Sequence, residues 1–468
     1  MRALHIQLDR SKGPVYKQIA SGLRELFQEG VLSRDSLIPS TRDLAEQFEV
    51  HRHTVTRALE ELVAEGWVES EPGRGFRVVF SPEANVSVPS KLWSDFPQIH
   101  GLGPDGVEDY DFPSGKPDLR LFPEEFFRVL RSCLRDIPSP DLLGYSDPSG
   151  SSALRLQLRE YLSRMRGVAR GQVMVTHGSQ EAIFLLGQLL ARGKDKLIAV
   201  ESLGYPPAWD ALRLSGAELA GVPVDQEGLD VAALERLIEH KKPALLYLTP
   251  LHQYPTTVSL SLARRERLLE LVCRHEIPVI EDDYDHEFHY YGRPTRPLAG
   301  EDKSGLVIYV STFSKLVYPS ARVGFCVVPD RLLEPLCRLK RATTRQNDLL
   351  IQETMASWMR QGGLDRHLRR MKKVYHHRLE VMSERLEKIG LSFHLPRGGM
   401  SLWVDLGERG ADIWARCWER GLRLRPGSFY ALDGGLDRNR FVRLGFAGTT
   451  PEEIQSGLNI LEQAVRVG

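Results

Sequence analysis

The region from Tyr110 to about residue 340 alternates short apolar runs with helical stretches, and helices dominate after it. This alternation is typical of βαβ units, in which helices cover a mostly parallel sheet. Three of the apolar runs end in polar residues, at Thr176–Gln180, Glu281–Tyr284 and Ser311–Lys315. Open α/β sheets bind ligands beyond the carboxyl ends of their strands. The sequence therefore predicts a ligand site where these three segments meet.

The polar residues at the strand ends match the chemical needs of one cofactor, pyridoxal 5'-phosphate. This cofactor needs an amine for an imine, and Lys315 follows small hydroxyl residues at a strand end. It needs a carboxylate beside its pyridine nitrogen, and Asp282 is placed for that role. Tyr284 lies two residues further along an extended segment, so we expect it to face the same side and to donate to the phenolic oxygen of the cofactor.

The phosphate of this cofactor needs oriented backbone donors, hydroxyl groups and a cation. The residues predicted to supply them are Gly178, Ser179 and Gln180 at the start of a helix, together with Thr312 and Arg322. Tyr205 is expected to stack on the ring face. Each residue alone is a weak signal, since a lone lysine is usually a solvated surface charge. Their joint presence, in this order, predicts a pyridoxal phosphate pocket.

Residues 1–78 have a different pattern, with dense helical periodicity. Apolar residues recur every four positions from Val15 to Phe27, as on the buried stripe of a first helix. Ser40 and Asp43 have the spacing of a capping box for a second helix. A third helix is expected to bury the apolar residues of Val55–Leu62. Two strands after it, the second of which ends at Val79, would form a hairpin. Three helices and a hairpin predict a winged helix-turn-helix domain.

The N-terminal end of the third predicted helix is basic. Residues 1–78 hold 11 Lys and Arg against 12 Asp and Glu, but the stretch His51–Leu59 has two Arg, two His and no acid. In helix-turn-helix proteins this end meets base edges, and Arg pairs bidentately with guanine. The residues predicted to contact double-stranded DNA are Arg42, His51, Arg52, His53, Thr54, Arg57, Arg74 and Gly75. A solvated basic face, or a winged helix that serves protein contacts, is the alternative.

The residues between the two patterned regions have the composition of a linker. Residues 79–108 hold four prolines, several serines and glycines, and no sustained periodicity. We therefore predict a DNA-binding domain at 1–78, a linker at 79–108, and an effector and dimerisation domain at 109–468. The whole chain has 62 Lys and Arg against 62 Asp and Glu, which excludes a uniformly basic coat.

The remaining sequence features indicate a cytoplasmic protein without a membrane span. Five scattered cysteines form no C-x-x-C pair, which is typical of free thiols in a reducing compartment. The first residues carry no signal-peptide core, and the longest apolar stretch, Ala182–Ala191, is too short to cross a bilayer. His286 and His289 lack further ligands, so no metal site is predicted. The basic stretch Arg366–Arg378 is expected to be a solvated helix face, with a second DNA contact as the alternative.

The N-terminal segment resembles the DNA-binding domain of GntR-type regulators over about residues 12–78. The resemblance rests on Ile38–Ala45, Val50–Val55, Ala58–Leu62, Glu65–Glu69 and Pro72–Gly75. In that family, the residues that match Arg42, Arg52, Thr54 and the wing around Gly75 contact DNA. His51 and His53 stand where small polar residues are commoner.

The large segment resembles fold-type-I aminotransferases, and specifically the MocR regulators, which fuse such a domain to a GntR-type domain. Beyond the strand ends, the resemblance rests on Phe112–Asp118, Leu121–Pro123, Leu143–Gly150, Leu154–Arg155, Pro396–Met400, Trp403 and Arg443–Phe446. It implies that Lys315 forms the imine, that Asp282 and Tyr284 hold the ring, and that Arg443 binds an amino-acid carboxylate. Tyr145 would reach the cofactor, in relatives often from the partner subunit, which implies a homodimer.

The expected fold is an α+β winged helix-turn-helix domain followed by an α/β fold-type-I aminotransferase-like domain. The latter would have a mostly parallel central sheet and a smaller C-terminal α+β subdomain. One departure stands out, because aminotransferases carry Asn-Pro-Thr-Gly where this chain has Tyr254–Thr257. That Asn donates to the phenolic oxygen of the cofactor, so its loss argues against full turnover.

Three functions are compatible with these patterns. The first is a transcription regulator that senses pyridoxal phosphate, or an amine or amino acid, through imine formation at Lys315. The second is a working pyridoxal phosphate-dependent aminotransferase with an accessory DNA-binding domain, and the third is a regulator with an inactive dimerisation scaffold. The missing Asn favours the first over the second, and the intact Lys315, Asp282, Tyr284 and Arg443 argue against the third. The sequence names neither the amine nor the operator.

Overall fold

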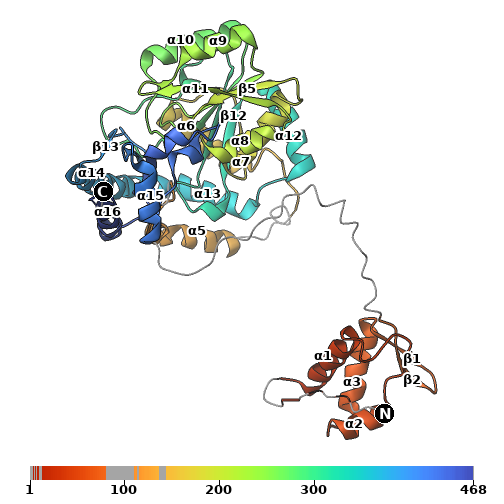
Figure 1. The fold of residues 1–468 in the computed structure, drawn as a ribbon. Coiled ribbons are helices and arrows are strands. Elements are labelled where there is room, and N and C mark those ends of the chain that lie inside the picture. Colours follow the sequence, from red (N-terminus) through yellow and green to blue (C-terminus); the bar gives the residue numbers. More distant parts are fainter. Residues whose placement is uncertain are drawn as a thin grey trace. The chain divides into compact units, whose positions relative to one another are not determined.

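The computed structural model describes residues 4, 6, 8–9, 13–80, 110–112, 115–135 and 144–466. The chain divides into two compact units, Met1–Asp105 and Gly106–Gly468, and each has its own hydrophobic core (Figure 1). Most of the predicted linker, residues 81–108, lies outside the described residues.

The first unit is a winged helix-turn-helix, as predicted. Its elements are α1 (Val15–Gln28), α2 (Thr41–Gln47), α3 (Arg52–Ala64), β1 (Val68–Glu71) and β2 (Gly75–Val78), and the two strands pair antiparallel. The Ser40 side chain caps α2 by accepting a hydrogen bond from the Asp43 N–H, at 3.2 Å. The predicted apolar face of α3 is buried against α1, so the hydrophobic spacing of both helices builds one shared core.

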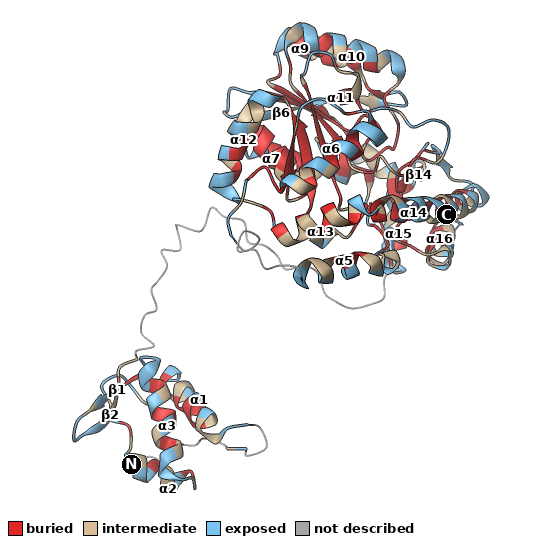
Figure 2. Cartoon of the chain, turned by 180° about the vertical axis from the view of Figure 1, so that it is seen from behind, coloured by how far each residue is buried: buried red, intermediate tan, exposed pale blue. Residues whose placement is uncertain are grey.

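The second unit is built on a seven-stranded sheet with the order β4-β12-β11-β10-β9-β5-β6. The strands are β4 (Gln172–Thr176), β5 (Leu197–Glu201), β6 (Glu218–Val222), β9 (Leu245–Leu248), β10 (Val279–Asp283), β11 (Val307–Thr312) and β12 (Gly324–Val328). Only β12 runs antiparallel to its neighbours. Because helices cover both faces, the central strands are buried almost throughout, which explains their near-continuous apolar runs (Figure 2).

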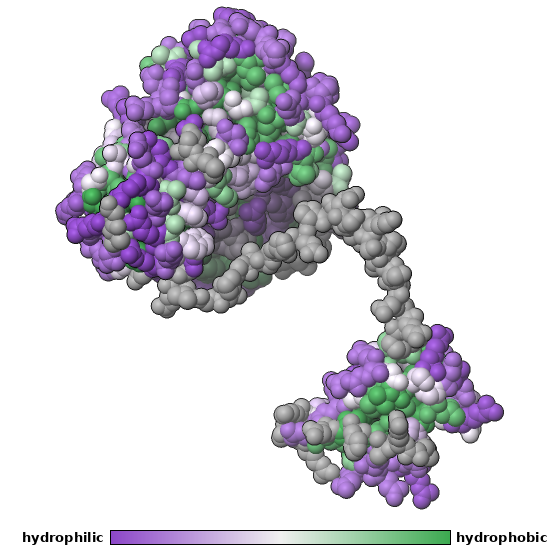
Figure 3. Space-filling view, in the orientation of Figure 1, coloured by the Kyte–Doolittle hydropathy of each residue, from purple (hydrophilic) through white to green (hydrophobic). Residues whose placement is uncertain are grey.

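Helices from alternate crossovers cover the two faces of this sheet. Ile198 of β5 packs in the core beneath α7 (Gly178–Leu190), α8 (Pro206–Arg213) and α12 (Asp330–Thr343). Its neighbour Ala199 points to the opposite face, toward α9 (Val231–His240), α10 (Leu262–His275) and α11 (Leu298–Glu301). The outer faces of α9 and α10, at the top of Figure 3, are hydrophilic, as expected of helices that bury one stripe. Two short strands, β7 (Val224–Asp225) and β8 (Gly228–Leu229), precede α9.

The C-terminal part forms the smaller subdomain around a three-stranded antiparallel sheet, β13-β14-β16. Its elements are α13 (Leu349–Arg360), α14 (Gly363–Ile389), β13 (Ser392–Phe393), β14 (Ser401–Asp405), α15 (Gly410–Glu419), β15 (Leu422–Arg423), β16 (Phe441–Gly445) and α16 (Pro451–Arg466). Arg443 is the third of the five residues of β16. This subdomain confirms the predicted fold class.

The residues that enter the second unit pack against both parts of it. They form β3 (Tyr110–Asp111), which pairs with β15, then the short helix η1 (Leu119–Leu121), α5 (Glu124–Arg135) and α6 (Ser152–Arg166). Three more single-turn helices are η3 (Pro319–Ala321), η4 (Gly427–Tyr430) and η5 (Leu436–Arg440). Across the described ranges, every helix is too short or too polar to cross a membrane.

Candidate functional site

A cavity of about 240 Å³ opens at the carboxyl ends of the central strands. Its lining consists of Gly115, Gly178, Ser179, Gln180, Tyr205, Thr249, Tyr254, Asp282, Tyr284, Thr312, Ser314, Lys315, Pro319, Arg322 and Arg443. The structure therefore brings together all the residues predicted for cofactor and effector except Tyr145. Five further lining residues were not predicted as site residues, namely Gly115, Thr249, Tyr254, Ser314 and Pro319. Thr249 follows an apolar strand without any motif that could have indicated it.

Lys315 lies in the turn after β11 and faces the cavity. Burial lowers the pKa of its amine to about 8, and the nearby charge of Arg443 acts in the same direction, against Asp285 and Asp282. About a tenth of the amine is then unprotonated at pH 7. Gly115 packs over this amine, since a Cβ on Gly115 would lie 3.5 Å from Lys315 Nζ. Lys315 is thus a buried amine poised as a nucleophile.

Asp282 lies at the end of β10, and only one of its two carboxylate oxygens accepts a hydrogen bond from the described residues. Its Oδ2 accepts a hydrogen bond from Tyr247 Oη at 2.9 Å, whereas its Oδ1 is buried and has no hydrogen-bond partner in the described part of the chain. Burial raises the pKa of this carboxyl to about 7. An unpaired buried carboxylate oxygen is costly. A protonated pyridine nitrogen is a donor of the kind that Oδ1 lacks.

The start of α7 forms a cradle suited to a phosphate. Helix α7 begins at Gly178, and the N–H groups of its first turn lie at the end of the helix that borders the cavity. Arg322 donates to the His177 carbonyl at 2.6 Å, and its Nη2 lies 3.2 Å from where a Gly178 Cβ would be. A Cβ on Gly324 would lie 2.5 Å from the Gly178 backbone, so only glycine allows this approach.

Two hydroxyl groups complete the cradle, while one predicted side chain turns away. The hydroxyls of Thr312 and Ser314 lie 3.0 Å apart and both line the cavity. The Gln180 amide donates to the Pro207 carbonyl, so Gln180 can serve an anion only through its backbone N–H. The donors fit a phosphate group. Together with Lys315 and Asp282, the residues present fit pyridoxal 5'-phosphate.

Arg443 enters the cavity from β16 of the smaller subdomain. It is 2% exposed, and its guanidinium carbon lies 3.9 Å from the centre of the Tyr254 ring. Its Nη2 donates weakly to Tyr284 Oη at 3.4 Å, but Nε and Nη1 are buried without a hydrogen-bond partner among the residues described. A buried guanidinium without an ion pair is unfavourable. A ligand carboxylate would supply the missing partner.

Tyr284 is placed in the cavity as expected, but its proton is already used. Its hydroxyl donates to the His252 carbonyl at 2.8 Å. A phenol has one proton, so in this arrangement the Tyr284 hydroxyl has none left for the phenolic oxygen of a cofactor. The sequence analysis missed this acceptor because His252 lies 32 residues away and offers a backbone oxygen.

Tyr254 occupies the cavity wall where aminotransferases carry the Asn. Its ring makes edge contacts with the rings of Tyr205, Tyr284 and Tyr430, at centroid distances of 5.1, 6.0 and 5.6 Å. The following Thr257 has a φ of +64°, a conformation that suits glycine and strains a β-branched residue. This backbone explains why relatives carry glycine at that position.

Tyr145 lies away from the cavity of its own chain. Its side chain is 78% exposed, and the guanidinium of Arg345 lies 3.9 Å above its ring. Gln346 fixes this segment by accepting a hydrogen bond from the Ser146 N–H, at 2.5 Å. A single copy of the chain therefore does not bring Tyr145 to the predicted cofactor.

The predicted DNA contacts come from α2, α3 and the hairpin of β1 and β2. All of them are exposed except Thr54, which is half-buried. His51 caps α3 by accepting from the His53 N–H, and Arg52 Nε donates to Thr41 Oγ1 at 3.0 Å, which joins the starts of α2 and α3. Arg57 differs from the others, because its guanidinium stacks 4.0 Å above the ring of Tyr16 on α1. Arg74 and Gly75 lie at the turn of the β1–β2 hairpin.

Comparison with known proteins assigns a family to each unit. Residues 15–78 match bacterial regulatory proteins of the gntR family, and residues 124–461 match aminotransferase class I and II. The second match spans more than half of the chain.

Three similar proteins differ in how much of the chain they share. The probable rhizopine catabolism regulatory protein MocR of Rhizobium meliloti is 32% identical over 98% of this chain and 95% of its own length. A 2-aminoadipate transaminase of Thermus thermophilus is 31% identical but covers only 76% of this chain and 89% of its own length. The crystal structure of Pyrococcus horikoshii kynurenine aminotransferase, in complex with PMP, superposes with a TM-score of 0.73 at 26% identity, over 80% of this chain and 99% of that one.

The extent of these matches decides between the families. The transaminase covers 76% of this chain, whereas the regulator covers 98% of it and therefore includes both units. With the winged helix-turn-helix and the aminotransferase fold both in place, the chain belongs to the MocR-type regulators, in which a GntR-family DNA-binding domain precedes a class I and II aminotransferase domain.

Proposed function

We propose that this protein is a transcription regulator that senses pyridoxal 5'-phosphate, or an amine or amino acid that reacts with it, at Lys315. In this proposal residues 1–78 bind double-stranded operator DNA, residues 79–108 form the linker, and residues 109–468 form the effector and dimerisation domain. The observation that carries the proposal is the set of unpaired buried groups around Lys315. Asp282 Oδ1 and two donors of Arg443 lack partners within the described residues. A cofactor and an effector carboxylate would supply both.

Each residue in the cofactor half of the cavity has one proposed role. When bound, pyridoxal phosphate supplies an aldehyde that forms an imine with an amine, and a ring that withdraws electrons. Lys315 Nζ is the amine for that bond, since its pKa of about 8 leaves part of it unprotonated near neutrality. Asp282 Oδ1 would accept a hydrogen bond from the protonated pyridine nitrogen, while the start of α7 and Arg322 would bind the phosphate.

The effector half of the cavity selects a carboxylate. A guanidinium offers its N–H donors in one plane, and Tyr254 covers a face of that plane, so the donors of Arg443 stay open at the edge. An effector whose carboxylate binds Arg443 would bring its amine beside Lys315 and compete with Nζ for the cofactor. Binding changes DNA affinity only if the two conformations of the protein bind the effector differently.

A working aminotransferase is the second candidate, and the presence of Lys315, Asp282 and Arg443 in one cavity favours it. Two observations favour the regulator instead. Tyr254 replaces the Asn donor, and the Tyr284 hydroxyl donates to the His252 carbonyl. Exchange of one amine for another needs neither donor, but transamination needs a stabilised carbanion. We therefore expect turnover far below the ~10 s⁻¹ that is typical of enzymes.

We further propose a homodimer, because the effector site is incomplete without a second copy. Tyr145 is matched to a cofactor-contacting position but is exposed outside the cavity of its own chain. Its ring is held beneath Arg345 in a fixed orientation. A partner subunit would receive this side chain at its own cavity.

The proposal is tested on the full-length protein with a duplex selected from a random-sequence DNA library. The DNA Kd is measured without cofactor, with pyridoxal phosphate, and with a panel of amino acids and amines. We expect Arg443→Ala to keep the visible absorbance of the bound cofactor but to lose the response to carboxylate-bearing amines. Steady keto-acid production at ordinary enzyme rates, with no change in DNA affinity, would support the aminotransferase instead.

A further inference from the structure

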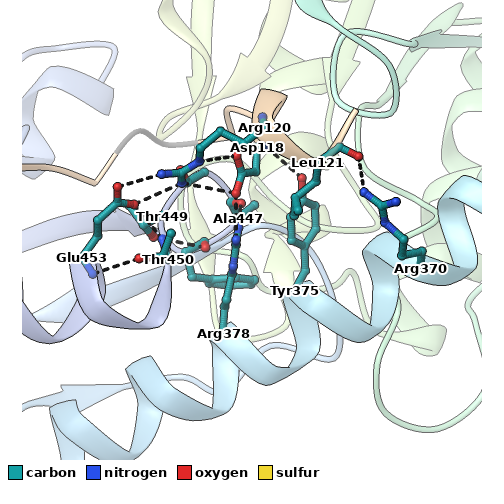
Figure 4. Close-up of polar contacts among 12 residues, drawn as sticks. Asp118, Arg120, Leu121, Arg370, Tyr375, Arg378, Ala447, Thr449, Thr450 and Glu453 are labelled. Carbon is teal, nitrogen blue, oxygen red and sulfur yellow. Dashed lines mark hydrogen bonds and ion pairs between the residues drawn. The ribbon is translucent and has the colours of Figure 1, made fainter. Parts of the chain in front are cut away.

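The segment Gly115–Leu121 runs from the cavity to contacts with the smaller subdomain, and Figure 4 shows these contacts at Asp118, Arg120 and Leu121. At one end, Gly115 lines the cavity and packs over Lys315. At the other end, the Asp118 carboxylate is buried and accepts hydrogen bonds from Arg120 Nε at 2.8 Å and Arg378 Nη2 at 2.7 Å. The Asp118 N–H donates to Tyr375 Oη at 3.0 Å. Only Lys116 and Pro117 lie between the cover over Lys315 and this anchor.

The anchor continues into the strand that carries Arg443. Arg120 donates to the Gly448 carbonyl at 3.2 Å and to Glu453 of α16 at 2.8 Å, and Arg378 donates to the Ala447 carbonyl at 2.5 Å. Ala447 and Gly448 are the second and third residues after the end of β16. Closer to the linker, the Phe112 carbonyl accepts from the Gly445 N–H at 3.3 Å. The stretch Gly445–Gly448 is therefore bonded to Phe112 at one end and to Arg120 at the other.

The charges of the anchor make it rigid. Burial raises the pKa of Asp118, but hydrogen bonds from Arg120 and Arg378 outweigh this and hold the pKa below its usual value. Arg378 is itself buried, at 4% exposure, so neither member of the Asp118–Arg378 pair has water as an alternative partner. Paired and bidentate contacts of this kind fix geometry as well as charge.

The same segment influences the electrostatics of the cavity. Gly115 contributes to the burial of Lys315, and the charge of Lys116 lowers the pKa of Lys315 further. Withdrawal of the segment would hydrate the amine and remove a neighbouring cation. Both changes would raise the pKa of Lys315 toward its ordinary value.

We propose that the ion pair of Asp118 with Arg120 is a positioning contact, which holds Gly115 over Lys315 and ties this cover to the residues after the strand of Arg443. Because the chain runs from the linker into β3 and then into this segment, a ligand that engages Arg443 is coupled to the residues that leave for the DNA-binding domain. The coupling part rests on the proposed function, while the positioning part concerns the protein without cofactor. Allosteric couplings of this kind amount to about 5–150-fold in affinity.

The test uses Arg120→Ala in the full-length protein, because Arg120 is half-exposed and its loss leaves the buried Asp118–Arg378 pair intact. The matched control is Arg385→Ala. It removes the contacts of Arg385 on α14 with Asn459 and Glu462 on α16, which lie away from this segment. Arg120→Lys keeps the charge and should recover part of the effect. Unfolding midpoints of all three establish that the fold is retained.

Two measurements separate the inference from the proposed function. The first is the pH dependence of Lys315 carbamylation by cyanate without cofactor, with a midpoint near pH 8 expected in wild type and in Arg385→Ala. Arg120→Ala should raise the midpoint by about half a pH unit or more. An unchanged midpoint overturns the positioning role, whatever the protein does to DNA.

The second measurement is the ratio of DNA Kd with and without pyridoxal phosphate. We expect this ratio to approach 1 in Arg120→Ala while the visible absorbance of the bound cofactor stays. A ratio equal to that of wild type overturns the coupling. If wild type itself shows no cofactor response, the proposed function fails, and the cyanate result alone decides the role of the Asp118–Arg120 contact.

Discussion

The functional residues of the two units meet solvent in opposite ways. In the DNA-binding unit, Arg52 and Arg74 are exposed, so water satisfies them until a nucleic acid replaces it. In the effector unit, Asp282 and Arg443 are buried and partly unpaired. This difference indicates that the exposed surface binds a partner by adding contacts. The buried site instead lacks hydrogen-bond partners until a ligand supplies them.

The largest effect is expected at the centre of the buried site. Lys315→Ala should abolish the visible absorbance of the lysine-bound cofactor and the DNA response to it, because no other amine lines the cavity among the residues described. The DNA affinity without cofactor should remain within about twofold of wild type, since residues 1–78 are unchanged. Absorbance spectra and DNA titrations check both. A cofactor response that persists in Lys315→Ala would show that the response does not depend on the buried amine of Lys315.

The contrast between the units also explains what the sequence could predict. Periodicity predicted the winged helix-turn-helix, because each of its helices buries one local stripe. The strand ends predicted the cavity, because parallel strands bring their carboxyl ends together. The interpretation of Arg366–Arg378 as a solvated helix face was wrong at Arg378, which is buried against Asp118, 260 residues away. Pairings at that separation leave no local pattern.

The same limit applies around the cavity. Tyr247 donates to Asp282, but in the sequence it is one of four residues of an apolar strand. The Tyr284 hydroxyl was expected to face a cofactor, and a backbone oxygen of His252 takes its proton. Sequence patterns thus predict which side chains meet, whereas their hydrogen-bond partners depend on the three-dimensional arrangement.

The next largest effect is expected on the exposed surface. Arg52→Ala should weaken binding to the selected duplex by about 1–3 kcal/mol, the contribution of a bidentate base contact. Arg74→Ala at the hairpin should weaken specific and random DNA alike, and its loss should reduce the salt dependence of binding. Gel-shift titrations at several salt concentrations distinguish the two. Wild-type affinity in Arg52→Ala would remove it from the base-reading surface.

The pH dependence of cofactor capture should distinguish the buried site from the exposed one. Only unprotonated Lys315 reacts, and burial lowers its pKa to about 8. Below pH 8 the capture rate should therefore fall about tenfold per pH unit, and above it the rate should level off. Stopped-flow absorbance on the protein without cofactor measures this rate. A midpoint near the ordinary lysine value would show that the amine is hydrated rather than buried.

The smallest effect concerns the loop that places Tyr254 in the cavity wall. Thr257 has a φ of +64°, where a β-branched residue is strained by about 1–3 kcal/mol. Glycine adopts this conformation freely but loses more backbone entropy on folding, about 0.5–1 kcal/mol. Thr257→Gly relieves this strain but also loses a buried hydroxyl that donates to the Thr256 carbonyl at 2.6 Å, so its denaturation midpoint should stay close to that of wild type. Thr256→Gly is the control from the same loop, because Thr256 has no positive φ and its hydroxyl donates to Gln253 at 2.5 Å. That variant should be destabilised, and equal losses in both variants would show that Thr257 is unstrained.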